Sequence, residues 1–357
     1  MDEILKIKNS IENGKNIGIL TKINASDDAT GATLALFFAL RKINKKVFFP
    51  LEEIPDKVYE IIKGKEQKKF HISFKEDVSE VYYEKNNKGI DLYLTPKNGD
   101  IDNESYSCKI ISGSESLISD FPYDVLITIG IQEFQEVEGM CENNLDQLYG
   151  CTVINIDNDL NNQNYGEVNL VEDGQSLSQA ISCLIKSLGQ EYLNSESANF
   201  LLYGLTTSPK NVYNKKNIPT IKWLFKKGGN LGLISRNDPK IKILEFALNS
   251  LTFSEAENIY ISALSEKNIL DSNATSKDFP FVIEKIKNFF KIPSFLLLWE
   301  SRTSPLSVKG IFYSENKSDV LKITNTFKGV SKNNGAMFLT EESSINLAKD
   351  KILSCLK

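Results

Sequence analysis

Apolar runs alternate with helical patterns in the first fifty residues of the chain. Residues 16–23 form an apolar run with the length of a buried strand. A helical pattern follows over residues 28–44, where apolar side chains recur every three or four positions, and residues 46–51 supply the next apolar run. Because a strand, a helix and a strand at this spacing form a parallel pair with a right-handed crossover, the start of the chain predicts a βαβ unit.

Two later runs, at residues 124–129 and 152–156, are apolar at nearly every position. Strands of this composition are typical of a parallel sheet whose two faces are both covered by helices. Helical patterns follow these runs at residues 176–188, 196–205 and 218–227. The sequence therefore predicts an α/β domain with a mostly parallel sheet over residues 1–237.

A polar stretch and a change of pattern complete the domain organisation. Residues 85–115 are rich in Asn, Asp, Gly and Ser, which predicts an elaborated surface insertion. Beyond residue 238, helical patterns come before strand patterns near 294–300 and 306–314, and a final strand–helix pair closes the chain. This order predicts a smaller α+β domain over residues 238–357. A length of 357 residues fits two domains.

The charge of the chain bears on its partners. The formal net charge is −5, and only three of the 42 basic residues are arginines. Arginine grips phosphate through a planar fork that lysine lacks. An acidic chain that is poor in arginine is unsuited to tight binding of duplex DNA. The composition does not exclude a local groove that binds a short single strand.

Location and metal chemistry follow from features that the sequence lacks. No run of about 18 apolar residues occurs, and the start has neither the basic nor the apolar segment of a signal peptide, so we expect a cytoplasmic protein without membrane contact. His71 is the single histidine, which excludes any site built on two imidazoles. The five cysteines have no CxxC spacing and suit isolated buried thiols in a reducing compartment.

Two acidic turns each follow a predicted strand. The first covers residues 22–32 and carries Asp27 and Asp28, and the second is Asp157-Asn158-Asp159. Carboxylates in such places cap helices and stabilise polar turns. They also lie where open α/β sheets place their ligands, and carboxylates at two strand ends can converge on one hard cation. From the residues alone, both interpretations are open.

In this order and context, the two turns resemble the DHH phosphoesterase family, which includes RecJ-like exonucleases, oligoribonucleases and some pyrophosphatases. Members have a turn of the form H-x-N-P-D-G-D-A-x-G-S after their first strand, and residues 22–32 keep its Asn24, Asp28 and Gly31. The second acidic turn is similar to the D-H-H motif itself. The resemblance implies a DHH-like phosphoesterase domain followed by a DHH-associated domain.

Most of the metal ligands that this resemblance implies are missing. The positions of the first histidine, the first aspartate, a later aspartate and the D-H-H histidines carry Lys22, Ser26, Gly130, Asn158 and Asp159. Asp28, Asp157 and Asp159 are thus a vestigial metal set, for which we expect no cofactor. The alternative is a reduced site in which these three carboxylates hold one Mg²⁺ or Mn²⁺, with Asp27 in place of the missing aspartate.

A turn near the C-terminus resembles the glycine-rich turn of the DHH-associated domain, which meets the phosphate or base of a short nucleotide substrate. Residues 328–336 are similar to that turn and keep Lys332 and Asn333. Tyr313 stands where the family has an arginine, and its ring is a surface on which a base can stack. The predicted binding residues are Lys22, Asn24, Asn158, Tyr313, Lys332 and Asn333.

These residues predict a phosphoesterase-like pseudoenzyme that is catalytically inactive and binds a nucleotide, a short single-stranded oligonucleotide or a protein partner. One alternative is an active phosphodiesterase or oligoribonuclease with a single-metal site, and another is a structural or assembly protein. The sequence has no GxxxxGK[ST] phosphate loop and no G-x-S-x-G nucleophile turn.

Overall fold

The computed structural model describes residues 2–48, 69–74, 77–86, 89–97, 106–111, 123–207, 217–232, 238–301 and 307–356. By its internal contacts the chain divides into two compact units, Met1–Val47 with Pro122–Lys357 and Phe48–Phe121. The domain boundary predicted at residues 237–238 falls within the first unit and stays a prediction. None of the described helices is long and apolar enough to cross a membrane.

The first unit contains a five-stranded sheet with the order β2-β1-β7-β8-β9. Its strands are β1 (Asn16–Thr21), β2 (Lys46–Phe48), β7 (Val125–Ile129), β8 (Thr152–Asp157) and β9 (Val168–Val171). β1 pairs with β7, β7 with β8 and β8 with β9, all in parallel. Nearly every residue of β1, β7 and β8 is buried, as expected for a sheet that is covered on both faces. The predicted α/β class with a mostly parallel sheet is confirmed.

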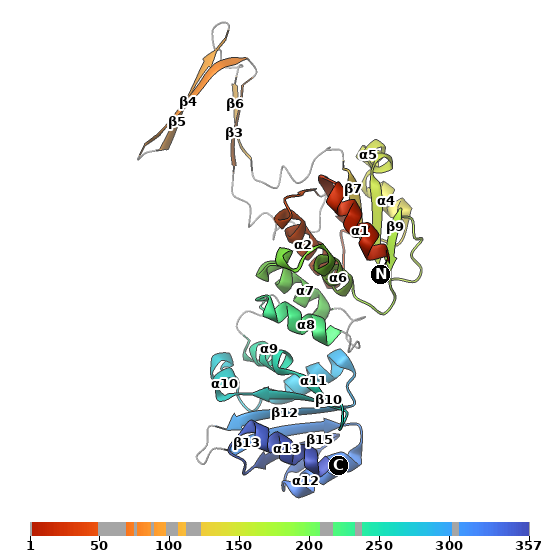
Figure 1. Cartoon of the computed structure of the whole chain (residues 1–357), viewed down its shortest axis with the longest axis vertical. Helices are drawn as coiled ribbons and strands as arrows, with labels where there is room; N and C mark the ends of the chain where they lie inside the picture. Colours follow the sequence, from red (N-terminus) through yellow and green to blue (C-terminus); the bar gives the residue numbers. More distant parts are fainter. Residues whose placement is uncertain are drawn as a thin grey trace. The chain divides into compact units, whose positions relative to one another are not determined.

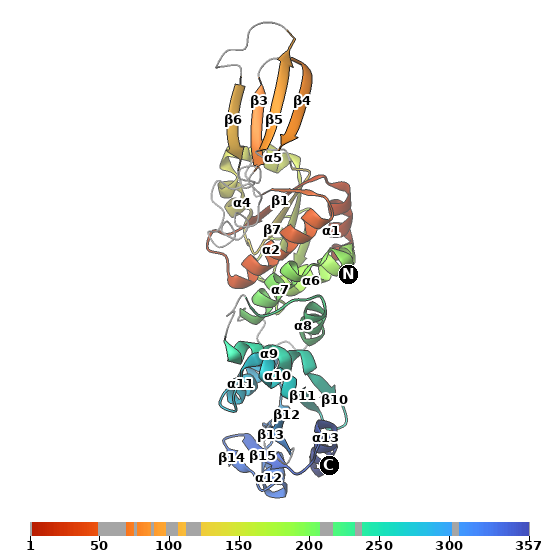
Figure 2. The same cartoon turned by 90° about the vertical axis from the view of Figure 1, so that its left-hand side faces the viewer.

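Seven helices and two short 3₁₀ turns accompany this sheet in the described part of the chain. They are α1 (Asp2–Asn13), α2 (Asp27–Lys42), α4 (Phe134–Met140), η2 (Glu142–Asn144), α5 (Leu145–Gly150), α6 (Leu177–Leu188), η3 (Gln190–Tyr192), α7 (Ser195–Thr207) and α8 (Asn217–Lys226). Ser26 caps α2 by accepting a hydrogen bond from the N–H of Ala29 at 3.2 Å. α2 is buried over most of its length and packs against α6 and α7, and Figures 1 and 2 show the three helices side by side.

Two glycines set the close approach of α2 and α7. A methyl group at Gly31 would lie 2.5 Å from the carbonyl oxygen of Phe200 and 3.1 Å from the amide nitrogen of Gly204. At Gly204 a methyl group would lie 2.0 Å from Oγ of Ser178 and 3.1 Å from Oδ1 of Asp28. The residue type at both positions is therefore dictated by packing, since only glycine lets the backbones meet.

A six-stranded sheet with the order β10-β11-β12-β13-β15-β14 forms the C-terminal part of the same unit. Its strands are β10 (Thr252–Ser254), β11 (Ile259–Leu264), β12 (Ser294–Ser301), β13 (Ser307–Ser314), β14 (Val330–Lys332) and β15 (Gly335–Thr340). Its helices are α9 (Pro239–Ser250), α10 (Glu266–Ser272), α11 (Phe279–Phe290), α12 (Lys317–Thr326) and α13 (Ile345–Leu356). α12 and α13 pack on one face around Phe312 and Phe338, while α9, α10 and α11 lie on the other side (Figure 1). The predicted α+β part is confirmed.

The second unit consists of two antiparallel strand pairs in its described residues. β3 (Lys69–Phe74) pairs with β6 (Tyr106–Ile111), and β4 (Val78–Asn86) pairs with β5 (Gly89–Pro96). The insertion predicted at residues 85–115 belongs to this unit, which extends further toward the N-terminus than polar composition indicated. His71 lies in β3, and its side chain is outside the described residues.

Substituting Gly31 by alanine should lower the free energy of unfolding by about 1–3 kcal/mol, because the new methyl group meets two backbone atoms that cannot move independently. Urea denaturation of the full chain measures this change. The matched control is Gly139→Ala in α4, where a methyl group meets no heavy atom within 4 Å. There we expect a gain of up to about 1 kcal/mol. Equal effects of the two substitutions would contradict the packing argument.

Candidate functional site

The strand order locates a candidate site at one edge of the parallel sheet. β1 lies between β2 and β7. The strand that follows β1 along the chain, β2, lies on one side of it, whereas β7, β8 and β9 lie in order on the other side. In open α/β sheets, ligands bind at the carboxyl ends of the strands where the order reverses in this way. Lys22, Gly130 and Asp157 stand at the carboxyl ends of β1, β7 and β8. The sequence-predicted acidic turns are therefore both at this edge.

Asp28 is buried and has a structural role at this edge. Its Oδ2 accepts the N–H of Leu177 at 3.0 Å, and its Oδ1 accepts the N–H of Ser178 at 2.9 Å. These amides are in the first turn of α6, where N–H groups have no partner within the helix, and Ser176 accepts the N–H of Gln179 in the same turn at 2.9 Å. A carboxylate there is also favoured by the helix dipole. Asp28 thus joins the start of α2 to the start of α6.

Asp157 is buried at the end of β8 and is held by an amide network. Its Oδ2 accepts a hydrogen bond from Nδ2 of Asn162 at 2.7 Å, and its Oδ1 accepts the N–H of Asn158 at 2.7 Å. Asn162 in turn accepts from Nδ2 of the buried Asn155 at 2.6 Å. Sequence reasoning missed Asn155 and Asn162, although the density of asparagines after β8 was a signal of local side-chain hydrogen bonding.

The remaining predicted residues of the second turn also have partners. Oδ2 of Asp159 accepts a hydrogen bond from Nε2 of Gln132 at 2.6 Å, and its Oδ1 accepts the N–H of Asn161 at 3.0 Å. Nδ2 of Asn158 donates to the carbonyl of Gln175 at 2.9 Å. This turn is therefore tied both to the segment after β7 and to the start of α6.

Lys22 forms an ion pair with Glu136, a residue of α4 that sequence reasoning missed. Nζ of Lys22 lies 2.8 Å from one carboxylate oxygen and 3.0 Å from the other, and each side chain is one-third exposed. Asn24, two residues further along, is exposed. Asp27 accepts a hydrogen bond from Tyr203, and burial together with this carboxylate raises the pKa of Tyr203 to about 12. Internal partners thus hold Lys22 and Asp27.

The donor set at this edge does not fit a metal centre. Among the described residues, no group of three or more His, Cys, Asp or Glu side chains is placed to hold a metal ion, so Asp28, Asp157 and Asp159 do not form one. Gly130 has φ of +69°, a conformation that an aspartate would adopt only with strain. Divalent cations need several anionic ligands free to replace their water. Here the carboxylate oxygens already accept hydrogen bonds from the chain.

Three described thiols, Cys141, Cys151 and Cys183, are not activated nucleophiles. Burial raises the pKa of Cys141 and of Cys151 to about 11. Burial also raises the pKa of Cys183. A thiol with a raised pKa stays protonated at neutral pH and is a poor nucleophile.

A second candidate site is a pocket of about 670 Å³ in the C-terminal sheet. It lies between α11, β13 and the β14–β15 hairpin. Its polar lining consists of Glu284, Lys287, Tyr313, Lys332, Asn333 and Asn334, and its apolar lining includes Ile283, Ile311, Val330 and Met337. The structure therefore brings together three predicted binding residues, Tyr313, Lys332 and Asn333. The other three, Lys22, Asn24 and Asn158, do not line this pocket.

The polar groups of this pocket have a defined arrangement. Nζ of Lys287 lies 4.9 Å from the centroid of the Tyr313 ring, and Asn334 donates a hydrogen bond to the Tyr313 hydroxyl. Burial and the nearby Glu315 carboxylate raise the pKa of Tyr313. Asn333, at the tip of the hairpin, has φ of +54°, which asparagine tolerates in tight hairpins. No carboxylate of the described residues forms a salt bridge with Lys287 or Lys332.

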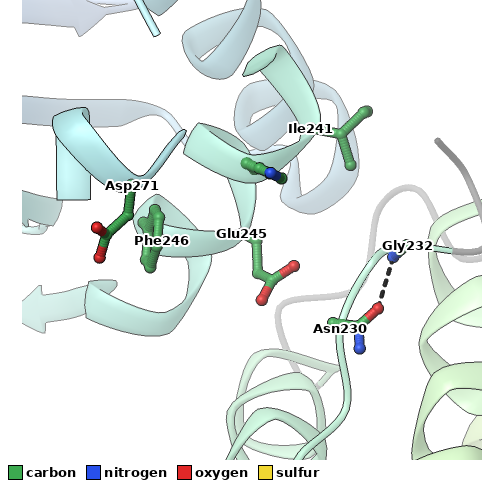
Figure 3. Close-up of a pocket in the computed structure, with 7 residues that line it drawn as sticks. Asn230, Gly232, Ile241, Glu245, Phe246 and Asp271 are labelled. Atoms are coloured by element: carbon green, nitrogen blue, oxygen red, sulfur yellow. Dashed lines mark hydrogen bonds between the residues drawn. The ribbon is translucent and has the colours of Figure 1, made fainter. Parts of the chain in front are cut away.

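A smaller pocket of about 330 Å³ lies beside α9 (Figure 3). Glu245 of α9 accepts the N–H of Leu231 at 3.1 Å, and burial raises the pKa of Glu245. Figure 3 shows Asn230 and Gly232 on the facing loop, with Oδ1 of Asn230 accepting the N–H of Gly232 at 2.8 Å. None of these residues was predicted from the sequence, and their hydrogen bonds stabilise the loop after α8.

No protein-family model matches the chain, and no curated protein matches its sequence. Among solved structures, the chain is similar to an exopolyphosphatase-related protein from Bacteroides fragilis, with 13% identity, a TM-score of 0.43 and coverage of 99% of this chain and 96% of that one. It is also similar to a protein of Methanococcus jannaschii assigned to the family II inorganic pyrophosphatases, with 13% identity, a TM-score of 0.24 and coverage of 65% and 80%. Similarity at this level does not extend either protein's activity to this chain.

Replacing Asp28 by asparagine should lower the free energy of unfolding by about 1–3 kcal/mol, because two buried N–H groups of α6 lose a charged acceptor. Thermal melting measures this loss, and we expect the wild-type melting temperature to be the same in EDTA and in Mn²⁺. Asp173→Asn, an exposed position shortly before α6, is the control and should change stability by less than about 0.5 kcal/mol. A Mn²⁺-dependent stabilisation that Asp28→Asn removes would instead identify Asp28 as a metal ligand.

Proposed function

We propose that this protein binds a nucleotide or a short single-stranded oligonucleotide in the C-terminal pocket and does not hydrolyse it. The observation that carries the proposal is that one pocket of about 670 Å³ contains the ring of Tyr313 together with Lys287 and Lys332. Neither lysine forms a salt bridge with a carboxylate of the described residues. This volume lies in the range of about 300–1,000 Å³ that is typical of small-molecule sites.

Each part of the pocket suits one part of a nucleotide. The Tyr313 ring and the neighbouring Ile311 and Met337 offer an apolar surface for a base, and base stacking on an aromatic ring contributes about 1–3 kcal/mol. Lys287 and Lys332 offer positive charge to a phosphate. The Asn333 amide can donate to and accept from the edge of a base.

The parallel-sheet edge supports binding without catalysis. A phosphoesterase of the kind that the sequence resembles needs metal ions to activate water and stabilise the phosphate. Here side-chain amides donate hydrogen bonds to the carboxylates of Asp157 and Asp159. The ammonium group of Lys22 pairs with Glu136 and puts a positive charge at the end of β1. We therefore propose a pseudoenzyme, whose ligand is recognised in the C-terminal sheet.

The composition limits the class of nucleic acid. A net charge of −5 and the scarcity of arginine favour a short, flexible ligand over a duplex, because duplex binding requires an extended basic surface. The proposed partner is accordingly a mononucleotide or a few nucleotides of single strand, which we expect the protein to meet in the cytoplasm.

The full chain should bind a labelled single-stranded RNA of about five nucleotides in EDTA, with the RNA left intact, as measured by fluorescence anisotropy and gel analysis. Lys332→Glu should weaken binding about tenfold or more, because it replaces an attractive charge by a repulsive one in the pocket. Lys322→Glu makes the same charge change on α12, which packs on the opposite face of the sheet, and should leave the affinity within about twofold.

Two results would contradict the proposal. Mn²⁺-dependent cleavage that disappears in Asp157→Asn would favour an active phosphoesterase with a reduced metal site. Absence of binding to the RNA and to all four nucleoside monophosphates would favour a protein that assembles with other proteins.

A further inference from the structure

Lys287 is a pocket residue that the sequence did not single out. It lies on α11, three residues after Glu284, and is half-buried where α11 faces β13. Its ammonium group lies over the ring of Tyr313, 4.9 Å from the ring centroid. Within the described part of the chain, no carboxylate lies within salt-bridge distance of it. Within those residues, the ammonium group of Lys287 contacts the ring of Tyr313.

This contact conflicts with stacking on the same ring face. Stacked aromatic rings have centroids about 4.5–7 Å apart, so a base on this face would occupy the layer that now holds the ammonium group. The base and Lys287 therefore compete for the ring. For the base to enter, the ammonium group must move aside while remaining in the pocket.

We infer that Lys287 makes the pocket selective for a phosphorylated ligand over the corresponding nucleoside. This inference rests on the proposed function. A nucleotide that displaces Lys287 from the ring gives the ammonium group a phosphate to bind, and a charged hydrogen bond replaces the contact with the ring. A nucleoside displaces Lys287 without offering it an anion. Nucleoside binding is therefore weaker, because the contact between Lys287 and the Tyr313 ring is lost and no new contact replaces it.

The charges around the pocket also orient the ligand. Glu284 is one helical turn before Lys287 in the middle of α11, and its carboxylate repels a phosphate that binds beside it. Lys287 and Lys332 come from different walls of the pocket, α11 and β14. The phosphate is thus directed toward the two lysines and away from Glu284, with the base at Tyr313.

Equilibrium binding of the full chain to the four ribonucleoside 5′-monophosphates and to the matching nucleosides tests the inference. We expect the wild type to bind the monophosphates about tenfold or more tightly than the nucleosides. Lys287→Met keeps a long unbranched side chain and removes the charge, and it should lower this ratio several-fold, with the remaining preference due to Lys332. Lys285→Met is the matched control, because Lys285 is on the same helix but lies over Phe281, with Nζ 5.6 Å from that centroid, and does not line the pocket.

A wild-type ratio near one, or a ratio that Lys287→Met leaves unchanged while the variant melts like the wild type, would overturn the inference and leave the proposed nucleotide binding intact. Failure of the wild type to bind any monophosphate, nucleoside or short RNA would overturn both. A ratio that falls equally in Lys285→Met would show a general effect of charge on α11, and it would also overturn the assignment to Lys287.

Discussion

The carboxylate of Asp28 is the interaction on which the parallel-sheet region depends. A buried charge is costly unless it has partners, and Asp28 obtains them from two backbone amides of α6, about 150 residues further along the chain. The same contact places α2 against α6, and Gly31 and Gly204 then let α2 approach α7. Asp28 thereby joins α2 to α6, and the two glycines bring α7 against α2.

The other charged groups at this edge follow the same principle. Lys22 pairs with Glu136, Gln132 donates to Asp159, and Asn162 donates to Asp157. In each case a donor from the chain itself occupies the position that a bound cation would take beside the carboxylate. The contacts at this edge therefore connect the ends of β1, β7 and β8 to the helices that cover the sheet. The C-terminal pocket, by contrast, contains two lysines that form no salt bridge with a carboxylate of the described residues, and we place the proposed ligand site there.

The sequence predicted the fold well where the signal was local. Continuous apolar runs identified β1, β7 and β8 because strands buried on both faces carry that pattern within a few residues. It did not reveal the partners of the acidic turns. Lys22 and Glu136 are 114 residues apart, and nothing in either neighbourhood predicts their contact. Lys287 could not be predicted either, because it is one of 42 basic residues and no neighbouring sequence pattern distinguishes it from the others. Tyr313, Lys332 and Asn333 were found through a resemblance, and the hairpin geometry explains why they share a pocket.

We propose that hydrogen-bond donors of the chain, and not metal ions, stabilise the carboxylates at the parallel-sheet edge. Electron paramagnetic resonance of Mn²⁺ tests it directly, because the free ion gives a signal that is lost on binding. We expect the wild-type chain and Asp157→Asn to leave the same free-ion signal across a Mn²⁺ titration. A stoichiometric loss of signal with the wild type that Asp157→Asn abolishes would contradict it.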